Sequence, residues 1–144
     1  MIFSELAKGA TLALDTAVLI YFLEKHPDFF PISKELFQKI ECGDHPAVMA
    51  TLVFAELLVP AWRSGESRRA TQVLQALNSF PHLRIMPLSA DIANQSARLR
   101  ARYNLRTPDA IHLATALAAN ADVFITNDRD LIRVESELPI VMIG

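Results

Sequence analysis

The sequence has little cysteine, little glycine and no long apolar segment. Cys42 is its single cysteine, which excludes an internal disulfide and a metal site made of several thiolates and is typical of a reducing compartment. The four glycines form neither a GxGxxG nor a Walker pattern, which excludes the common phosphate-binding loops. No apolar run approaches the roughly 18 residues that a membrane helix needs. The N-terminus lacks a basic region followed by an apolar core, so we expect no signal peptide and a cytoplasmic protein.

Neither sign of charge dominates. Sixteen acidic residues against 14 basic ones give a formal charge of −2, which argues against a strongly basic, general nucleic-acid binder but is compatible with a local basic patch. The 144 residues, 51% of them hydrophobic, are enough for one domain with its own core. We predict a single domain over residues 1–144, in which residues 1–10 form an extension without a structural signal.

Short apolar runs alternate with helical patterns along the chain. Strands are predicted at residues 11–14, 47–50, 83–88, 123–126 and 140–143. Helices are predicted at residues 16–25, 29–42, 52–63, 66–80, 90–103 and 107–119, with a loop or helical turn at 129–134. Thr51, Ser89 and Thr107 are the expected N-caps of three of these helices. The alternation predicts a three-layer α/β fold with a mainly parallel central sheet flanked by helices.

Four acids lie at positions where an α/β fold commonly has functional residues. Asp15 ends the first strand, Glu56 lies inside a helix, Asp109 falls in the first turn of a helix, and Asp128 follows a strand. Functional crevices in open α/β sheets lie outside the C-terminal ends of the strands. Clustered carboxylates repel each other and persist with protons or cations between them. Oxygen-only ligands select hard cations, so the pattern predicts a Mg²⁺ or Mn²⁺ site that can promote phosphodiester hydrolysis.

Each of these residues also has a simpler explanation. Asp109 can be an acid that only stabilises a helix start, and Asp128 in Asn-Asp-Arg-Asp can be only a turn residue. Glu56 can be solvated if its helix face is exposed. His112 is expected to be a satisfied core histidine rather than a ligand. Asp15 is the hardest to explain without function, because it interrupts an apolar strand–helix junction.

Two further groups accompany these acids. Around the last one, the side chains expected either to orient ligands or to shape the turn are Thr126, Asn127 and Asp130. The densest basic cluster of the chain is either a solvated helix face or an RNA contact, and its candidate RNA-binding residues are Arg98, Arg102 and Arg106.

Three segments together resemble a known family. They are LALDTAVLIYFLE from residue 12, TLVFAELL from residue 51, and TPDAIHLATALAANADVFITNDRDL from residue 107. They are similar to the PIN-domain ribonucleases, and most similar to the VapC-type toxins of toxin–antitoxin pairs, over residues 12–143. The resemblance implies a metal-dependent endoribonuclease that leaves 5′-phosphate and 3′-hydroxyl ends. Its implied metal site consists of Asp15, Glu56, Asp109 and Asp128, supported by Thr126.

The resemblance also implies partners, namely an RNA substrate, a cognate antitoxin and a second copy of the chain. Composition points the same way, because several large apolar side chains exceed what one small core hides: Phe22, Phe29, Phe54, Leu58 and Trp62. We therefore expect a homodimer, a partner helix on an apolar groove, or both.

Two other function classes remain open. A different Mg²⁺-dependent phosphoryl-transfer domain, such as a phosphatase or receiver-like module, would carry a phosphoaspartate at Asp15. The DxD pattern of that phosphatase class is absent, because Thr16 and Ala17 follow. A non-catalytic binding module would use the acids only to hold a structural cation.

Overall fold

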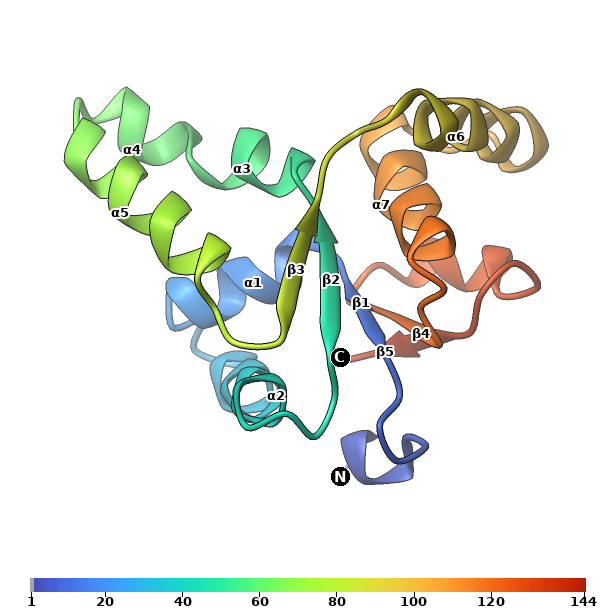
Figure 1. Cartoon of the computed structure of the whole chain (residues 1–144), viewed down its shortest axis with the longest axis horizontal. Helices are drawn as coiled ribbons and strands as arrows, with labels where there is room; N and C mark the ends of the chain where they lie inside the picture. Colours follow the sequence, from blue (N-terminus) through green and yellow to red (C-terminus); the bar gives the residue numbers. More distant parts are fainter. Residues whose placement is uncertain (1) are drawn as a thin grey trace.

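A five-stranded sheet forms the centre of the protein. The computed structural model describes residues 2–144, so Met1 of the predicted extension lies outside the described residues. The strands are β1 (Leu12–Leu14), β2 (Ala47–Ala50), β3 (Leu83–Met86), β4 (Val123–Thr126) and β5 (Ile140–Met142). They run in the order β3-β2-β1-β4-β5, and every neighbouring pair is parallel (Figure 1). The predicted parallel α/β sheet is confirmed.

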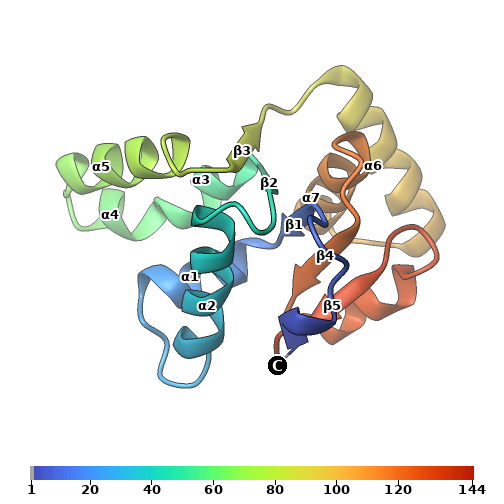
Figure 2. The ribbon, with the colours of Figure 1, turned by 60° about the horizontal axis from the view of Figure 1, so that its bottom comes forward.

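Helices cover both faces of this sheet. One face packs on α1 (Thr16–Leu23), α2 (Phe30–Glu41) and α5 (Ser67–Asn78), and the other on α6 (Ala90–Tyr103) and α7 (Thr107–Ala118). Figure 2 shows α1 and α2 on one side of the strands and α6 and α7 on the other. The alternation of side chains along a strand separates the two cores. Leu12 and Leu14 point into the first and Ala13 into the second, which confirms the three-layer prediction.

The helix predicted over residues 52–63 is divided in two. It forms α3 (Leu52–Leu57) and α4 (Val59–Arg63), with Leu58 as the residue between them. Pro60 is the second residue of α4, where its missing N–H leaves no helical hydrogen bond unmade. The proline therefore starts a new helix instead of kinking a continuous one.

One of the three predicted N-caps is wrong. The Ser89 hydroxyl accepts a hydrogen bond from the backbone N–H of Ile92 at 3.1 Å, as predicted. Thr51 is the N-cap residue of α3, as predicted, but it has helical backbone angles and its side chain makes no capping hydrogen bond. Arg106, in extended conformation, is the N-cap of α7, so Thr107 is already inside that helix. This shift makes Asp109 the third helical residue, still in the first turn as predicted.

The N-terminal segment carries more structure than the sequence indicates. Ile2–Glu5 forms the 3-10 helix η1, and the Phe3 side chain is buried in the core beside α1 and α2. Near the other end, Arg129–Val134 forms a second 3-10 helix, η2, which agrees with the helical turn predicted there. No helix within residues 2–144 has the length and apolarity that a membrane crossing requires.

Large apolar side chains are better buried than their number suggests. Phe22 stacks on Phe37 with ring centroids 4.7 Å apart, and Phe29 packs on Tyr21 at 4.9 Å. Trp62 differs, because 62% of its surface is exposed. The expected excess of apolar surface is therefore centred on α3 and α4.

Candidate active site

Asp15 lies where β1 becomes α1. Its Oδ1 accepts the backbone N–H of Thr16 at 2.8 Å, and its Oδ2 accepts the Thr126 hydroxyl at 2.8 Å. The pairing of β1 with β4 brings these strand ends together, since Leu14 is in register with Ile125. Thr126 Oγ1 also accepts the backbone N–H of Asp128 at 3.0 Å. The Thr126 hydroxyl, which is fully buried, therefore connects Asp15 with the Asp128 segment.

The carboxyl group of Asp15 is in an unfavourable place for a negative charge. Burial raises its pKa above the ordinary 3.8, and the charge of Asp109 adds to the rise. The hydrogen bonds from Thr126 and Thr16 and the nearby His112 lower the pKa without cancelling the effect of burial. A cation bound to this carboxylate would offset the remaining free-energy cost of its buried negative charge.

Glu56 reaches the same edge from α3. Its Oε1 lies 2.7 Å from His112 Nε2 and accepts the Thr16 hydroxyl at 2.9 Å. The His112 hydrogen bond is the main cause of a lowered pKa for Glu56. With 36% of its side chain exposed, Glu56 is neither buried alone nor simply solvated, but held as an anion by two donors.

Arg106 interacts electrostatically with all four acids. Its Nε lies 3.2 Å from Asp109 Oδ2, and 78% of the arginine side chain is exposed against 15% for the aspartate. The pKa of Arg106 is raised, first by Asp109 and also by Asp128 and Asp15. The same guanidinium contributes to the lowered pKa of Glu56. Four acids from distant parts of the sequence thus act on one cation at one edge of the sheet.

The other predicted supporting residues lie at the margin. Asp128 Oδ1 accepts the backbone N–H of Asp130 at 3.0 Å, while the Asp130 carboxylate pairs with Arg133 at 3.1 Å. Asn127 Nδ2 donates to the Tyr21 hydroxyl at 3.0 Å. Asp130 therefore orients Asp128 through its backbone, and the Asn127 amide is directed to α1.

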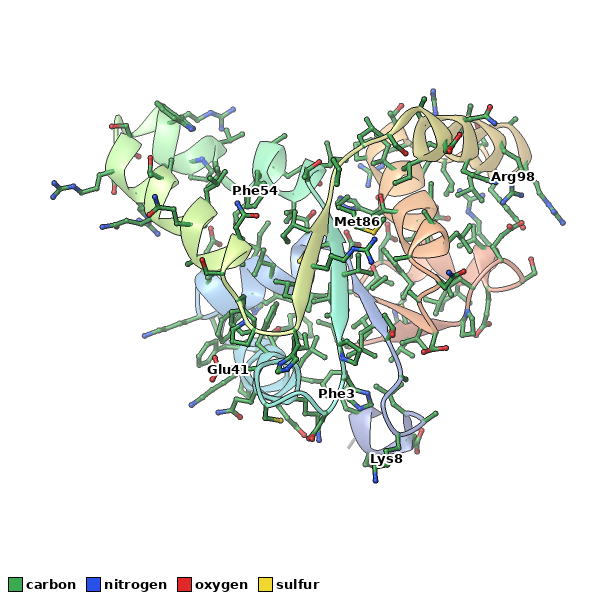
Figure 3. All side chains as sticks on the ribbon, viewed as in Figure 1. Phe3, Lys8, Glu41, Phe54, Met86 and Arg98 are labelled. Atoms are coloured by element: carbon green, nitrogen blue, oxygen red, sulfur yellow. The ribbon has the colours of Figure 1, made fainter. Side chains whose placement is uncertain are left out.

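The candidate RNA-binding arginines separate into two places. Arg98 and Arg102 both pair with Glu137, at 2.8 and 3.3 Å. Figure 3 shows Arg98 on α6, well away from α3, the helix that carries Glu56. Arg106 alone of the three pairs with a predicted site acid.

Comparison with known proteins agrees with this arrangement. The model of the family described as PIN domain matches residues 12–137, which is most of the chain. The chain belongs to the PIN-domain family. A comparison with curated proteins finds no match.

Solved structures similar to this PIN domain come from toxin–antitoxin pairs. One is a toxin–antitoxin complex from Klebsiella pneumoniae, with 26% identity, a TM-score of 0.68, and 94% of this chain and 98% of the other covered. VapBC2 from Rickettsia felis bound to a DNA fragment from its promoter has 23% identity, a TM-score of 0.68 and coverages of 92% and 98%. VapC20 from Mycobacterium tuberculosis, a toxin that cleaves the sarcin-ricin loop, has 16% identity, a TM-score of 0.67 and coverages of 87% and 95%.

Two polar residues of this PIN domain were not predicted as part of the site. Thr16 donates its hydroxyl to Glu56 and its backbone N–H to Asp15. His112 is buried as expected but is not a satisfied core histidine, because its Nδ1 has no hydrogen-bond partner among residues 2–144. Their spacing carries the signal, since Thr16 directly follows Asp15 and His112 is three residues after Asp109, on the same helical face.

The donors of this PIN domain fit a hard cation in kind. Carboxylate and hydroxyl oxygens dominate the site, and the raised pKa of Asp15 indicates a charge that lacks compensation. Within residues 2–144, however, no three His, Cys, Asp or Glu side chains are grouped closely enough to form a ready-made metal site. A cation would therefore have to draw the acids inward from these positions.

Proposed function

We propose that this PIN domain is a Mg²⁺- or Mn²⁺-dependent endoribonuclease and the toxin of a toxin–antitoxin pair. The observation that carries the proposal is the convergence of Asp15, Glu56, Asp109 and Asp128 around Arg106, at the C-terminal edge of the parallel sheet. An excess of carboxylates with one exposed cation is suited to a divalent ion and a phosphodiester, and poorly suited to a purely structural role.

Each residue has a defined part in this reaction. The four acids would hold the cation through carboxylate oxygens. When bound, a divalent cation neutralises charge on the phosphate and lowers the pKa of water. Thr126 and Thr16 keep the Asp15 carboxylate oriented by hydrogen bonds at both oxygens. Arg106, exposed at the edge of the site, exchanges Asp109 for a phosphate oxygen of the incoming RNA.

The decisive experiment is cleavage of labelled single-stranded RNA by the purified protein. We expect cleavage with Mn²⁺ or Mg²⁺, none with EDTA, and none from the Asp15→Asn variant. Sequencing of RNA ends after brief expression in cells would then identify the target. A wild type that binds Mn²⁺ but cuts no RNA from a total cellular pool, and does not slow growth, would instead indicate a binding module.

An antitoxin partner is proposed for the apolar groove between α1, α2 and α5. The groove has a volume of about 350 Å³, and its lining includes Leu19, Phe22, Val73, Ala76 and Phe80. A groove of this kind accepts the apolar face of a partner helix. The similarity of the whole chain to structures solved as toxin–antitoxin complexes supports an antitoxin partner.

Two variants of α5 test this groove. Ala76→Glu places a charge in the groove lining, and Gln75→Glu places the same charge one residue away on an exposed position. After expression in the native host, wild type and Gln75→Glu should co-purify with a small protein that Ala76→Glu loses. Retention of the same partner by Ala76→Glu would place the contact elsewhere.

A homodimer is proposed through α3 and α4. The exposed Trp62 lies in a shallow apolar depression with Phe54, Leu58 and Val59. Light scattering should give the mass of two chains for wild type and of one chain for Trp62→Glu. A wild type that stays monomeric at high concentration would contradict this proposal.

A further inference from the structure

His112 occupies an unusual position for a buried histidine. Its side chain, on α7, is only 2% exposed. Nε2 lies 2.7 Å from Glu56 Oε1 and 3.0 Å from Thr16 Oγ1. Three helices, α1, α3 and α7, therefore meet at one ring nitrogen.

The contacts assign the hydrogen to Nε2. The Thr16 hydroxyl has a single hydrogen, which it donates to Glu56 Oε1 at 2.9 Å, so Thr16 meets the imidazole as an acceptor. A ring nitrogen 2.7 Å from a carboxylate oxygen must also carry a hydrogen, because two lone pairs at this distance would repel each other. Nδ1, the other nitrogen, is buried without a partner among residues 2–144. The hydrogen bonds of the His112 ring therefore all go to site residues, through Nε2, and none goes to the core.

Both donors select the same oxygen of Glu56. Thr16 and His112 bond Oε1, and within residues 2–144 no donor reaches Oε2. Glu56 is thus fixed at one oxygen and left with the other oxygen for a ligand. The same threonine bonds Asp15 through its backbone, so the network joins two of the acids.

We propose that His112 is the positioning residue that holds Glu56 and Thr16 ready for a divalent cation. The proposal rests on the proposed function, since it concerns the same acids. A long Glu side chain has several rotatable bonds, and fixing one oxygen removes the ordering cost that a cation would otherwise meet. Nε2 donates to Oε1 and leaves Oε2 without a protein donor among residues 2–144. His112 itself touches neither the cation nor RNA.

Calorimetric Mn²⁺ binding by the whole chain tests this role with four proteins. His112→Phe keeps a ring but removes the N–H, whereas His112→Gln keeps an N–H near the position of Nε2. Thr115→Val is the matched control, because Thr115 is equally buried on α7 but bonds only its own helix, at Ile111 O. We expect His112→Phe to weaken Mn²⁺ binding by about 10-fold or more. His112→Gln should recover most of the affinity, and Thr115→Val should keep it.

Nuclear magnetic resonance of the folded wild type gives an independent measurement. Long-range ¹H–¹⁵N spectra should show the His112 hydrogen on Nε2. Mg²⁺ should shift this resonance but not those of His45, which is buried against Ala10 O at 3.0 Å, away from the site. This measurement needs no variant, so it holds even if His112→Phe fails to fold.

The outcomes separate the two proposals. Mn²⁺ binding that is unchanged in His112→Phe, or weakened equally by Thr115→Val, would overturn the role of His112 and leave the nuclease intact. A hydrogen on Nδ1, or a His112 resonance that ignores Mg²⁺, would also overturn it. A wild type that binds no divalent cation would overturn the proposed function, and this inference with it.

Discussion

Two charged clusters lie on the α6–α7 half of the molecule, and their composition is opposite. Around Glu137, two arginines and the Tyr103 hydroxyl, 2.8 Å away, surround one carboxylate. Around Arg106, one exposed guanidinium pairs with Asp109 and acts through its charge on Asp15, Glu56 and Asp128. The first cluster pairs its single carboxylate with three donors, while the second leaves negative charge in excess.

The pKa values report this difference. Arg98 and Tyr103 lower the pKa of Glu137, and Glu137 raises that of Arg98. Burial raises the pKa of Asp15. The ionised Glu137 stabilises the fold, whereas the ionised Asp15 keeps an unfavourable charge that a ligand can relieve. Charge density alone therefore does not identify a site; the missing compensation does.

The largest expected effect is that of Asp109→Asn, which removes one carboxylate from the Arg106 cluster. Asparagine keeps the shape and suits the first turn of a helix, so the fold should persist. Loss of a ligand charge should reduce cation-dependent RNA cleavage by about 100-fold or more, beyond the effect of an outer-shell residue. A labelled-RNA assay with Mn²⁺, beside a thermal melt in EDTA, measures both effects. Cleavage at the wild-type rate would make Asp109 only a helix-start acid.

The Glu137 cluster should respond in the opposite way to Glu137→Gln. Removing the carboxylate leaves Arg98 and Arg102 without their common partner, at a cost of about 1 kcal/mol for a partly exposed network. RNA cleavage should remain at the wild-type rate, because the cluster pairs with no site acid. Urea unfolding gives the stability. A large loss of cleavage would extend the site to this cluster.

Stability against pH should distinguish the two carboxyl groups by sign. The folded pKa of Asp15 lies above 3.8, so its ionisation costs stability as pH rises through that value. Relative to wild type in EDTA, Asp15→Asn should gain stability as the pH rises above 3.8. The folded pKa of Glu137 lies below 4.5, so its contribution is present above pH 4.5 and disappears as pH falls. The deficit of Glu137→Gln should therefore shrink in acid, and parallel curves would contradict the assignment of both groups.

The smallest effect expected concerns RNA affinity. In an inactive Asp15→Asn background, Arg106→Gln should weaken single-stranded RNA binding a few-fold and lower the salt slope by about 0.7, as for one lost phosphate contact. Arg102→Gln is the matched control, because Arg102 is also exposed and paired with a carboxylate, but with that of Glu137, which is not one of the four site acids. Fluorescence anisotropy at several salt concentrations measures both. Equal effects of the two variants would return RNA binding to the whole arginine cluster.

Most of the fold was predictable from local sequence patterns. Apolar runs predicted all five strands, because a central parallel strand is buried on both faces and tolerates few polar residues. Helix starts were less predictable. Thr107 was a plausible cap, but the chain turns one residue earlier, at Arg106. A cap depends on backbone angles that the neighbouring loop imposes, and these are not visible in residue type.

The four acids and their places at strand ends and helix starts were predictable from residue patterns. Asp15, Asp109 and Asp128 follow from local patterns, because a carboxylate at an apolar strand end or in a first helical turn is visible in one segment. The hydrogen-bond and ion-pair partners of the polar side chains, in contrast, depend on the packing of the helices. His112 was predicted to be a satisfied core histidine, and its contact with Glu56 joins residues 56 positions apart. Arg98, Arg102 and Arg106 form one cluster in sequence, yet Glu137 takes two of them from a segment about 35 to 40 residues further along the chain. Hydrogen bonds and ion pairs act over about 3 Å, so which polar groups meet is decided by how the helices pack on the sheet.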